Sequence, residues 1–64
     1  MDHSDFAIGL EFEMSGSKWR CTDVGTRTII AIKLDVPDPS WLSGPPYAVE
    51  EVVIDEDDFP ACTR

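Results

Sequence analysis

Hydrophobic and polar residues alternate through the first quarter of the chain. Apolar side chains occupy every second position between residues 6 and 14, namely Phe6, Ile8, Leu10, Phe12 and Met14. Successive side chains of a β-strand point to opposite faces, so this period of two predicts a strand with one face on a core.

Two further strands continue the pattern. Polar, turn-forming residues fill positions 15–18, and alternation resumes from Trp19 to Thr22. A second turn at 23–26 contains Gly25, and the β-branched segment 28–34 follows it. The chain therefore predicts a three-stranded antiparallel meander joined by two tight turns.

Loops of four residues set the predicted register. They place Met14 opposite Trp19 and Cys21 opposite Thr28, and the two hairpins then agree on one apolar face. The predicted core face consists of Phe6, Ile8, Leu10, Phe12, Met14, Trp19, Cys21, Thr28, Ile30, Ile32 and Leu34. The predicted outer face consists of Glu11, Glu13, Lys18, Arg20, Thr22, Arg27, Ile29, Ala31 and Lys33.

The segment 35–47 contains four of the five prolines, which restrict its backbone and predict a stiff loop. Trp41 and Leu42 lie in its middle. Aromatic residues are usually buried, so we expect Trp41 to fold back over an open end of the core. The other interpretation is that Trp41 is an exposed anchor for a partner.

The segment 49–55 is rich in β-branched residues and predicts a fourth strand. Short strands, tight turns and one long loop predict an all-β domain, a small curved antiparallel sheet of the SH3-like barrel type built on the meander. The alternative is an α+β fold, in which one short helix at 48–57 covers a three-stranded sheet. Either way, residues 1–64 form a single domain with short flexible tails at 1–4 and 61–64.

The chain is short and acidic. Its 64 residues carry 13 acidic and five basic side chains, for a formal net charge of -8. Such a charge disfavours nucleic acid and anionic membranes and favours a basic partner. We find no segment typical of a signal peptide or a membrane helix, which predicts a cytoplasmic protein. A core this small predicts a monomer or a weak homodimer.

No arrangement of residues predicts catalysis or a cofactor. Cys21, Cys62 and His3 lack the spacing of a zinc site, and a cytosolic location favours reduced thiols. The acidic run 55–58 lacks the glycine and the distal glutamate of a calcium loop. Cys21 belongs to the predicted core face, and no base adjoins it. We therefore expect no metal, no cofactor and no enzymatic activity.

The remaining hypothesis is a small domain that binds another protein, one with a basic surface. The proline-rich loop would provide an apolar anchor, and the acidic turn would attract the basic partner. The candidate partner-binding residues are Trp41, Leu42, Tyr47, Asp55, Glu56, Asp57 and Asp58. The alternative is a nucleic-acid-associated module that uses basic residues of the outer face, Lys18, Arg20, Arg27 and Lys33.

One block of the sequence resembles other proteins. The run Trp-Arg-Cys-Thr-Asp-Val-Gly-Thr-Arg-Thr-Ile, which begins at Trp19, is similar to a block in short uncharacterised bacterial proteins. The resemblance implies a bacterial, cytosolic origin. No function is known for those proteins, so it carries over no activity and no site residue.

Overall fold

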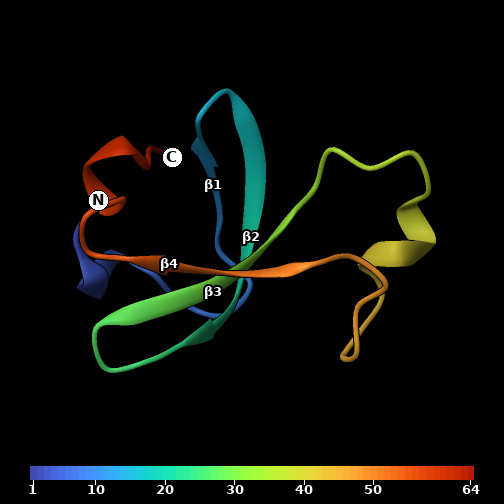
Figure 1. Cartoon of the computed structure of the whole chain (residues 1–64), viewed down its shortest axis with the longest axis horizontal. Coiled ribbons are helices and arrows are strands. Elements are labelled where there is room, and N and C mark those ends of the chain that lie inside the picture. The colour runs from blue at the N-terminus through green and yellow to red at the C-terminus, as the bar shows by residue number, and fades with distance from the viewer.

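The computed structural model describes residues 1–64 as one all-β domain, which confirms the predicted fold class (Figure 1). One open antiparallel sheet has the strand order β1-β2-β3-β4. The strands are β1 (Glu11–Met14), β2 (Ser17–Val24), β3 (Thr28–Lys33) and β4 (Glu51–Asp55). Three short 3₁₀ helices complete the fold: η1 (His3–Asp5), η2 (Pro39–Leu42) and η3 (Phe59–Ala61). The alternative helix at 48–57 is wrong, because β4 occupies that segment.

The first strand is shorter than the alternation predicts. Gly9 has a φ of +93°, in the left-handed region that glycine adopts without strain. Its N–H donates to the Cys21 carbonyl at 2.8 Å, while the Cys21 N–H donates to the Leu10 carbonyl at 2.8 Å. Gly9 and Leu10 thus both lie opposite Cys21, as in a β-bulge, and the chain bends away from the sheet. The predicted strand is wrong over residues 6–10, and Ile8 is 70% exposed rather than in the core.

The first hairpin turns in two residues instead of four. Ser15 and Gly16 have φ values of 54° and 79°, and positive φ at both positions is typical of a type I′ turn. Phe12 therefore pairs with Trp19, and Met14 pairs with Ser17. The predicted register is wrong by two residues. Because two is the period of a strand, the faces of β1 and β2 are as predicted.

The second hairpin differs more. Cys21 pairs with Ala31 instead of with the predicted partner Thr28, and a bulge at Thr22 interrupts the ladder. A register difference of three residues is odd, so β3 presents the opposite face to the core. Ile29 and Ala31 were predicted on the outer face, and that prediction is wrong because both are fully buried.

The main hydrophobic cluster lies on one face of the sheet. Its eight buried residues are Phe6, Phe12, Cys21, Ile29, Ala31, Ile54, Phe59 and Cys62. Phe6 packs against Phe12 and Phe59, with ring centroids 5.2 and 4.9 Å apart. The segments outside the sheet, before β1 and after β4, thus cover the core face. Ile8, Thr28, Ile30 and Leu34 were predicted as core residues and do not belong to this cluster. Ile32, also predicted as a core residue, lies outside the cluster as well but is fully buried, on the other face of β3.

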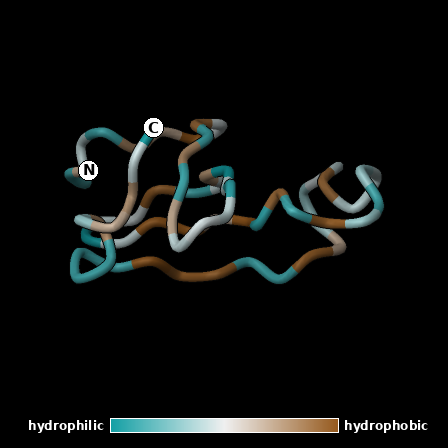
Figure 2. The backbone as a smooth tube through the Cα atoms, turned by 90° about the horizontal axis from the view of Figure 1, so that it is seen from above, coloured by the Kyte–Doolittle hydropathy of each residue, from teal (hydrophilic) through white to brown (hydrophobic).

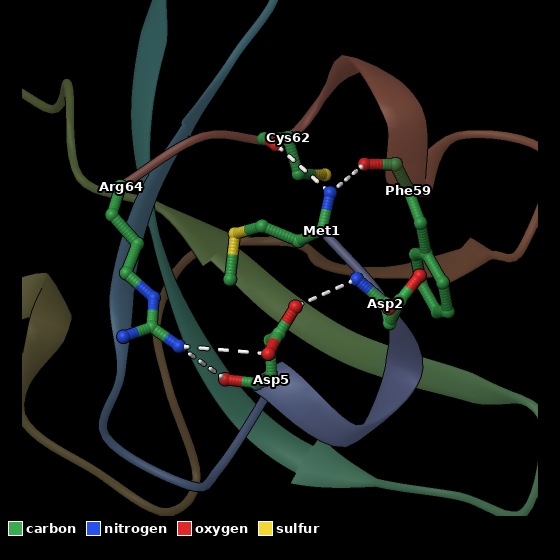
Figure 3. A network of polar contacts seen from close by, with 6 residues as sticks. All are labelled: Met1, Asp2, Asp5, Phe59, Cys62 and Arg64. Carbon is green, nitrogen blue, oxygen red and sulfur yellow. Dashed lines mark hydrogen bonds and ion pairs between the residues drawn. The ribbon is translucent and has the colours of Figure 1, made fainter.

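Both chain ends are packed parts of the domain, contrary to the predicted flexible tails. The Met1 amino group donates to the carbonyls of Phe59 and Cys62 at 2.9 and 3.3 Å (Figure 3). The Arg64 guanidinium lies 3.9 Å from the Asp5 carboxylate. Thr63 forms an antiparallel bridge with Glu13, so the C-terminal segment lies along the outer edge of β1.

The segment between β3 and β4 leaves the body of the domain. It contains η2 and extends from the sheet, at the right of both views (Figures 1 and 2). We call residues 34–50 the projecting loop. The acidic turn 55–58 follows β4 at its other end, so β4 separates these two parts of the predicted site (Figure 1).

Candidate functional site

Local hydrogen bonds shape the projecting loop. Asp38 precedes η2, and its carboxylate accepts from the Ser40 N–H at 3.0 Å and from the Ser40 hydroxyl at 2.8 Å. These bonds lower the pKa of the Asp38 carboxyl below its usual value, because they stabilise its charged form. A carboxylate at this position is a standard helix N-cap, and Pro39 suits the first helical position.

The two arms of the projecting loop also contact each other. The Ala48 N–H donates to the Trp41 carbonyl at 3.2 Å, which brings the end of the loop back to η2. The Tyr47 ring lies against Gly44, so closely that a Cβ on Gly44 would be 2.8 Å from the ring. The peptide bonds preceding Pro45 and Pro46 are both cis. The loop is therefore internally packed, although it stands outside the core.

Trp41 does not cover the core. It is 38% exposed and belongs neither to the core cluster nor to the side chains that pack against that cluster. The expectation that Trp41 folds back over the core is therefore wrong. Leu42 and Tyr47, which belong to the same loop, are half-buried. These three predicted site residues share one loop, and Trp41 is its most exposed large apolar side chain.

The acidic turn has a different environment. The Asp55 carboxylate accepts from the Asp57 N–H at 3.0 Å, which stabilises the turn after β4. Arg27 forms an ion pair with Glu56, and its Nε donates to Glu56 at 2.9 Å. This pairing raises the pKa of the Arg27 guanidinium, which stays charged. Asp57 and Asp58 are exposed and form no ion pair.

The predicted site is therefore divided. The residues of the projecting loop precede β4, the residues of the acidic turn follow it, and the two groups lie at opposite ends of that strand (Figure 1). Four residue steps of a strand span about 13 Å. A partner that contacts both groups must extend along β4.

The basic residues do not gather on one face. Arg20 pairs with Glu11 at 3.3 Å, and Arg27 pairs with Glu56. Lys33 lies opposite Trp19, on the sheet face that carries the core. The geometry thus provides no continuous basic surface of the kind that a phosphate backbone requires.

The two cysteines are free and buried. Cys62, predicted in a tail, belongs to the core, and its thiol donates to the Asp58 carbonyl at 3.5 Å. The Cys21 thiol donates to the Asp23 carbonyl at 3.3 Å. Burial raises the pKa of both thiols, which disfavours the nucleophilic thiolate. His3 is engaged elsewhere, with its Nε2 2.7 Å from the Gly25 carbonyl oxygen.

The structure shows neither a metal-binding cluster nor a pocket. No three His, Cys, Asp or Glu side chains lie close enough together to hold a metal ion, and the surface has no pocket. None of the helices is long and apolar enough to cross a membrane. Val53 was not among the predicted site residues, and it is 63% exposed on β4. The sequence feature that could have identified Val53 is the alternation of Glu51, Val53 and Asp55, which places all three on one face of the strand.

The fold defines the chain as a small all-β domain with one open four-stranded sheet. Comparisons of the chain with protein-family models, with curated proteins and with solved structures found no match. The resemblance to short bacterial proteins, and the likeness to SH3-like barrels, stay predictions.

Proposed function

We propose that the protein is a small non-enzymatic interaction domain that binds a basic protein partner. The observation that carries this proposal is the exposed Trp41 on an internally packed loop outside the core. Tryptophans are enriched among the residues that dominate binding energies. The hydrogen bonds of Asp38 and Ala48 order the loop beforehand, which reduces the entropy lost on binding.

The charge of the domain supports a basic partner. The net charge is -8, and both arginines of the sheet region are already paired with glutamates. An acidic surface accelerates association with a basic protein, and added salt weakens that attraction. The paired arginines give the nucleic-acid alternative no such support.

Affinity capture with matched variants tests the proposal. The wild-type domain and the Trp41→Ser variant are immobilised, and captured proteins are identified from an extract at low and high salt. Ile8→Ser is the matched control, because Ile8 is also exposed, at 70%, but lies far from the loop in sequence. We expect a basic partner whose capture is salt-sensitive, is kept by Ile8→Ser and falls at least about 30-fold with Trp41→Ser.

Two results would contradict the proposal. One is a folded Trp41→Ser variant that captures the same partner as strongly as the wild type. The other is capture that nuclease treatment abolishes and that Arg20→Ala or Arg27→Ala weakens, because this pattern indicates nucleic acid.

A further inference from the structure

The two edges of the sheet differ. At the β1 edge, Thr63 and Glu13 exchange two backbone hydrogen bonds of 2.6 and 2.9 Å. At the other edge, β4 pairs with β3 alone. No backbone hydrogen bond from another segment reaches Glu51 or Val53. An unpaired edge strand is a template on which a further strand can be added.

The hydrogen bonds of β3 show which groups of β4 face outward. The carbonyls of Thr28 and Ile30 accept from Gly25 and from the Thr22 hydroxyl, both toward β2. Backbone groups of a strand alternate between its two neighbours, so Ile29 and Ala31 face β4. Their partners Ile54 and Val52 complete that ladder.

The residues between those partners therefore direct their N–H and C=O groups away from the sheet. They are Glu51 and Val53, with the N–H of Asp55 beyond them. Their side chains share the sheet face opposite the core, where Val53 is 63% exposed and both acids are exposed. The Glu51 carboxylate accepts from the Thr22 hydroxyl at 3.3 Å, and the Asp55 carboxylate accepts from the Asp57 N–H at 3.0 Å. The open edge thus presents an acidic, an apolar and an acidic side chain in alternation.

This alternation of side chains determines which kind of strand can pair with the β4 edge. A second copy of the chain, antiparallel and centred on Val53, would place Glu51 opposite the other copy's Asp55. Like charges directly opposite each other are destabilising, whereas opposite charges stabilise a cross-strand pair. A fitting strand carries an apolar residue opposite Val53 and a Lys or Arg two residues to either side.

We propose that β4 binds an extended basic segment of a partner protein, which adds to the sheet as a fifth strand. The inference rests on the proposed function, because it specifies how the basic partner docks. It also relates the two separated parts of the predicted site, since a strand along β4 runs between the acidic turn and the projecting loop (Figure 1). Main-chain hydrogen bonds would provide affinity, and the alternating side chains would provide specificity.

The test uses a synthetic peptide, acetyl-Thr-Lys-Thr-Val-Thr-Lys-Thr-amide, titrated into the isotope-labelled domain and followed by NMR. Two control peptides are matched to it: one has Glu in place of both Lys, and one has N-methylvaline at the centre. The second control keeps every charge and removes one backbone donor. We expect shifts and slowed hydrogen exchange at the amides of Glu51 and Val53 with the first peptide only.

Variants of the domain provide the second arm. Val53→Pro removes the outward N–H and leaves the ladder to β3 intact, since proline is tolerated at an edge strand when its N–H side faces solvent. We expect it to abolish binding, while Val53→Thr keeps binding. Glu51→Gln combined with Asp55→Asn should weaken binding about twofold to thirtyfold, the effect of two cross-strand charge pairs. Should Val53→Pro not fold, the N-methylated peptide still removes a hydrogen bond from the same edge.

Several outcomes would overturn the inference. These are no change at the β4 amides with millimolar peptide, equal binding of the N-methylated peptide, and concentration-dependent shifts at β4 without peptide, which indicate a second copy. If the peptide fails while Trp41-dependent capture holds, the docking mode is wrong and the proposed function stands. Failure of both experiments refutes both proposals.

Discussion

Neighbouring isoleucines of β3 provide a sensitive test of the register. Ile29 is fully buried in the core, whereas Ile30 is half-buried on the opposite face. Ile29→Val deletes one methylene from a filled core, which typically costs ~0.5–1.5 kcal/mol. Valine is also β-branched, so the strand propensity hardly changes. The same substitution at Ile30 should cost less than ~0.5 kcal/mol, because solvent already reaches that side chain.

The difference is measurable in so small a domain. A 64-residue chain is expected to have a free energy of unfolding of roughly 3–10 kcal/mol, and 1 kcal/mol shifts its Tm by about 4–8 °C. Guanidinium unfolding followed by far-UV circular dichroism gives the free energies, and equal m-values show that both variants unfold from comparable states. A larger cost for Ile30→Val than for Ile29→Val would refute the register, because it would put Ile30 in the core.

Three further predictions concern the first turn, the thiols and the projecting loop. Gly16→Ala places a side chain at a φ of +79° and should lower the free energy of unfolding by about 1 kcal/mol; an unchanged urea midpoint would exclude the two-residue turn. Cys21 and Cys62 should resist iodoacetamide at pH 8 until the protein is denatured, and ready labelling of the native protein would show that a thiol is exposed. Because burial raises their folded-state pKa, the free energy of unfolding should be constant below the unfolded pKa of ~8.5 and fall as the pH rises above it. Gly44→Ala should displace the Tyr47 ring, seen as shifted ring resonances, with little change in Tm; unchanged resonances would contradict the contact.

The positions of three strands follow from the sequence alone. Residues within β2, β3 and β4 alternate or are β-branched, and turn-forming residues separate them. These signals are local, so they predict the elements without knowledge of the packing. The first hairpin also keeps its predicted faces, because its register error is an even number of residues. The prolines likewise predict the projecting loop, since each restricts the backbone around it.

Which face of β3 packs on the core could be determined only from the tertiary structure. In Thr-Ile-Ile-Ala-Ile-Lys both faces of the strand are apolar, so alternation does not distinguish Ile29 and Ala31 from Ile30 and Ile32. The bulge at Thr22 sets the register, and Cys62, from a segment predicted as a flexible tail, packs with Phe59 on the buried face. Such contacts join residues distant in the chain, and no local pattern encodes them.

The candidate site divides in the same way. Trp41 and the acidic turn were predicted as site residues from the sequence, because residue type and clustering along the chain can be recognised without a structure. The tertiary structure decided that Trp41 lies outside the core, that β4 separates it from the acids, and that β4 is the open edge of the sheet. Exposure and strand order depend on which segments cover which others, and these are properties of the packed chain.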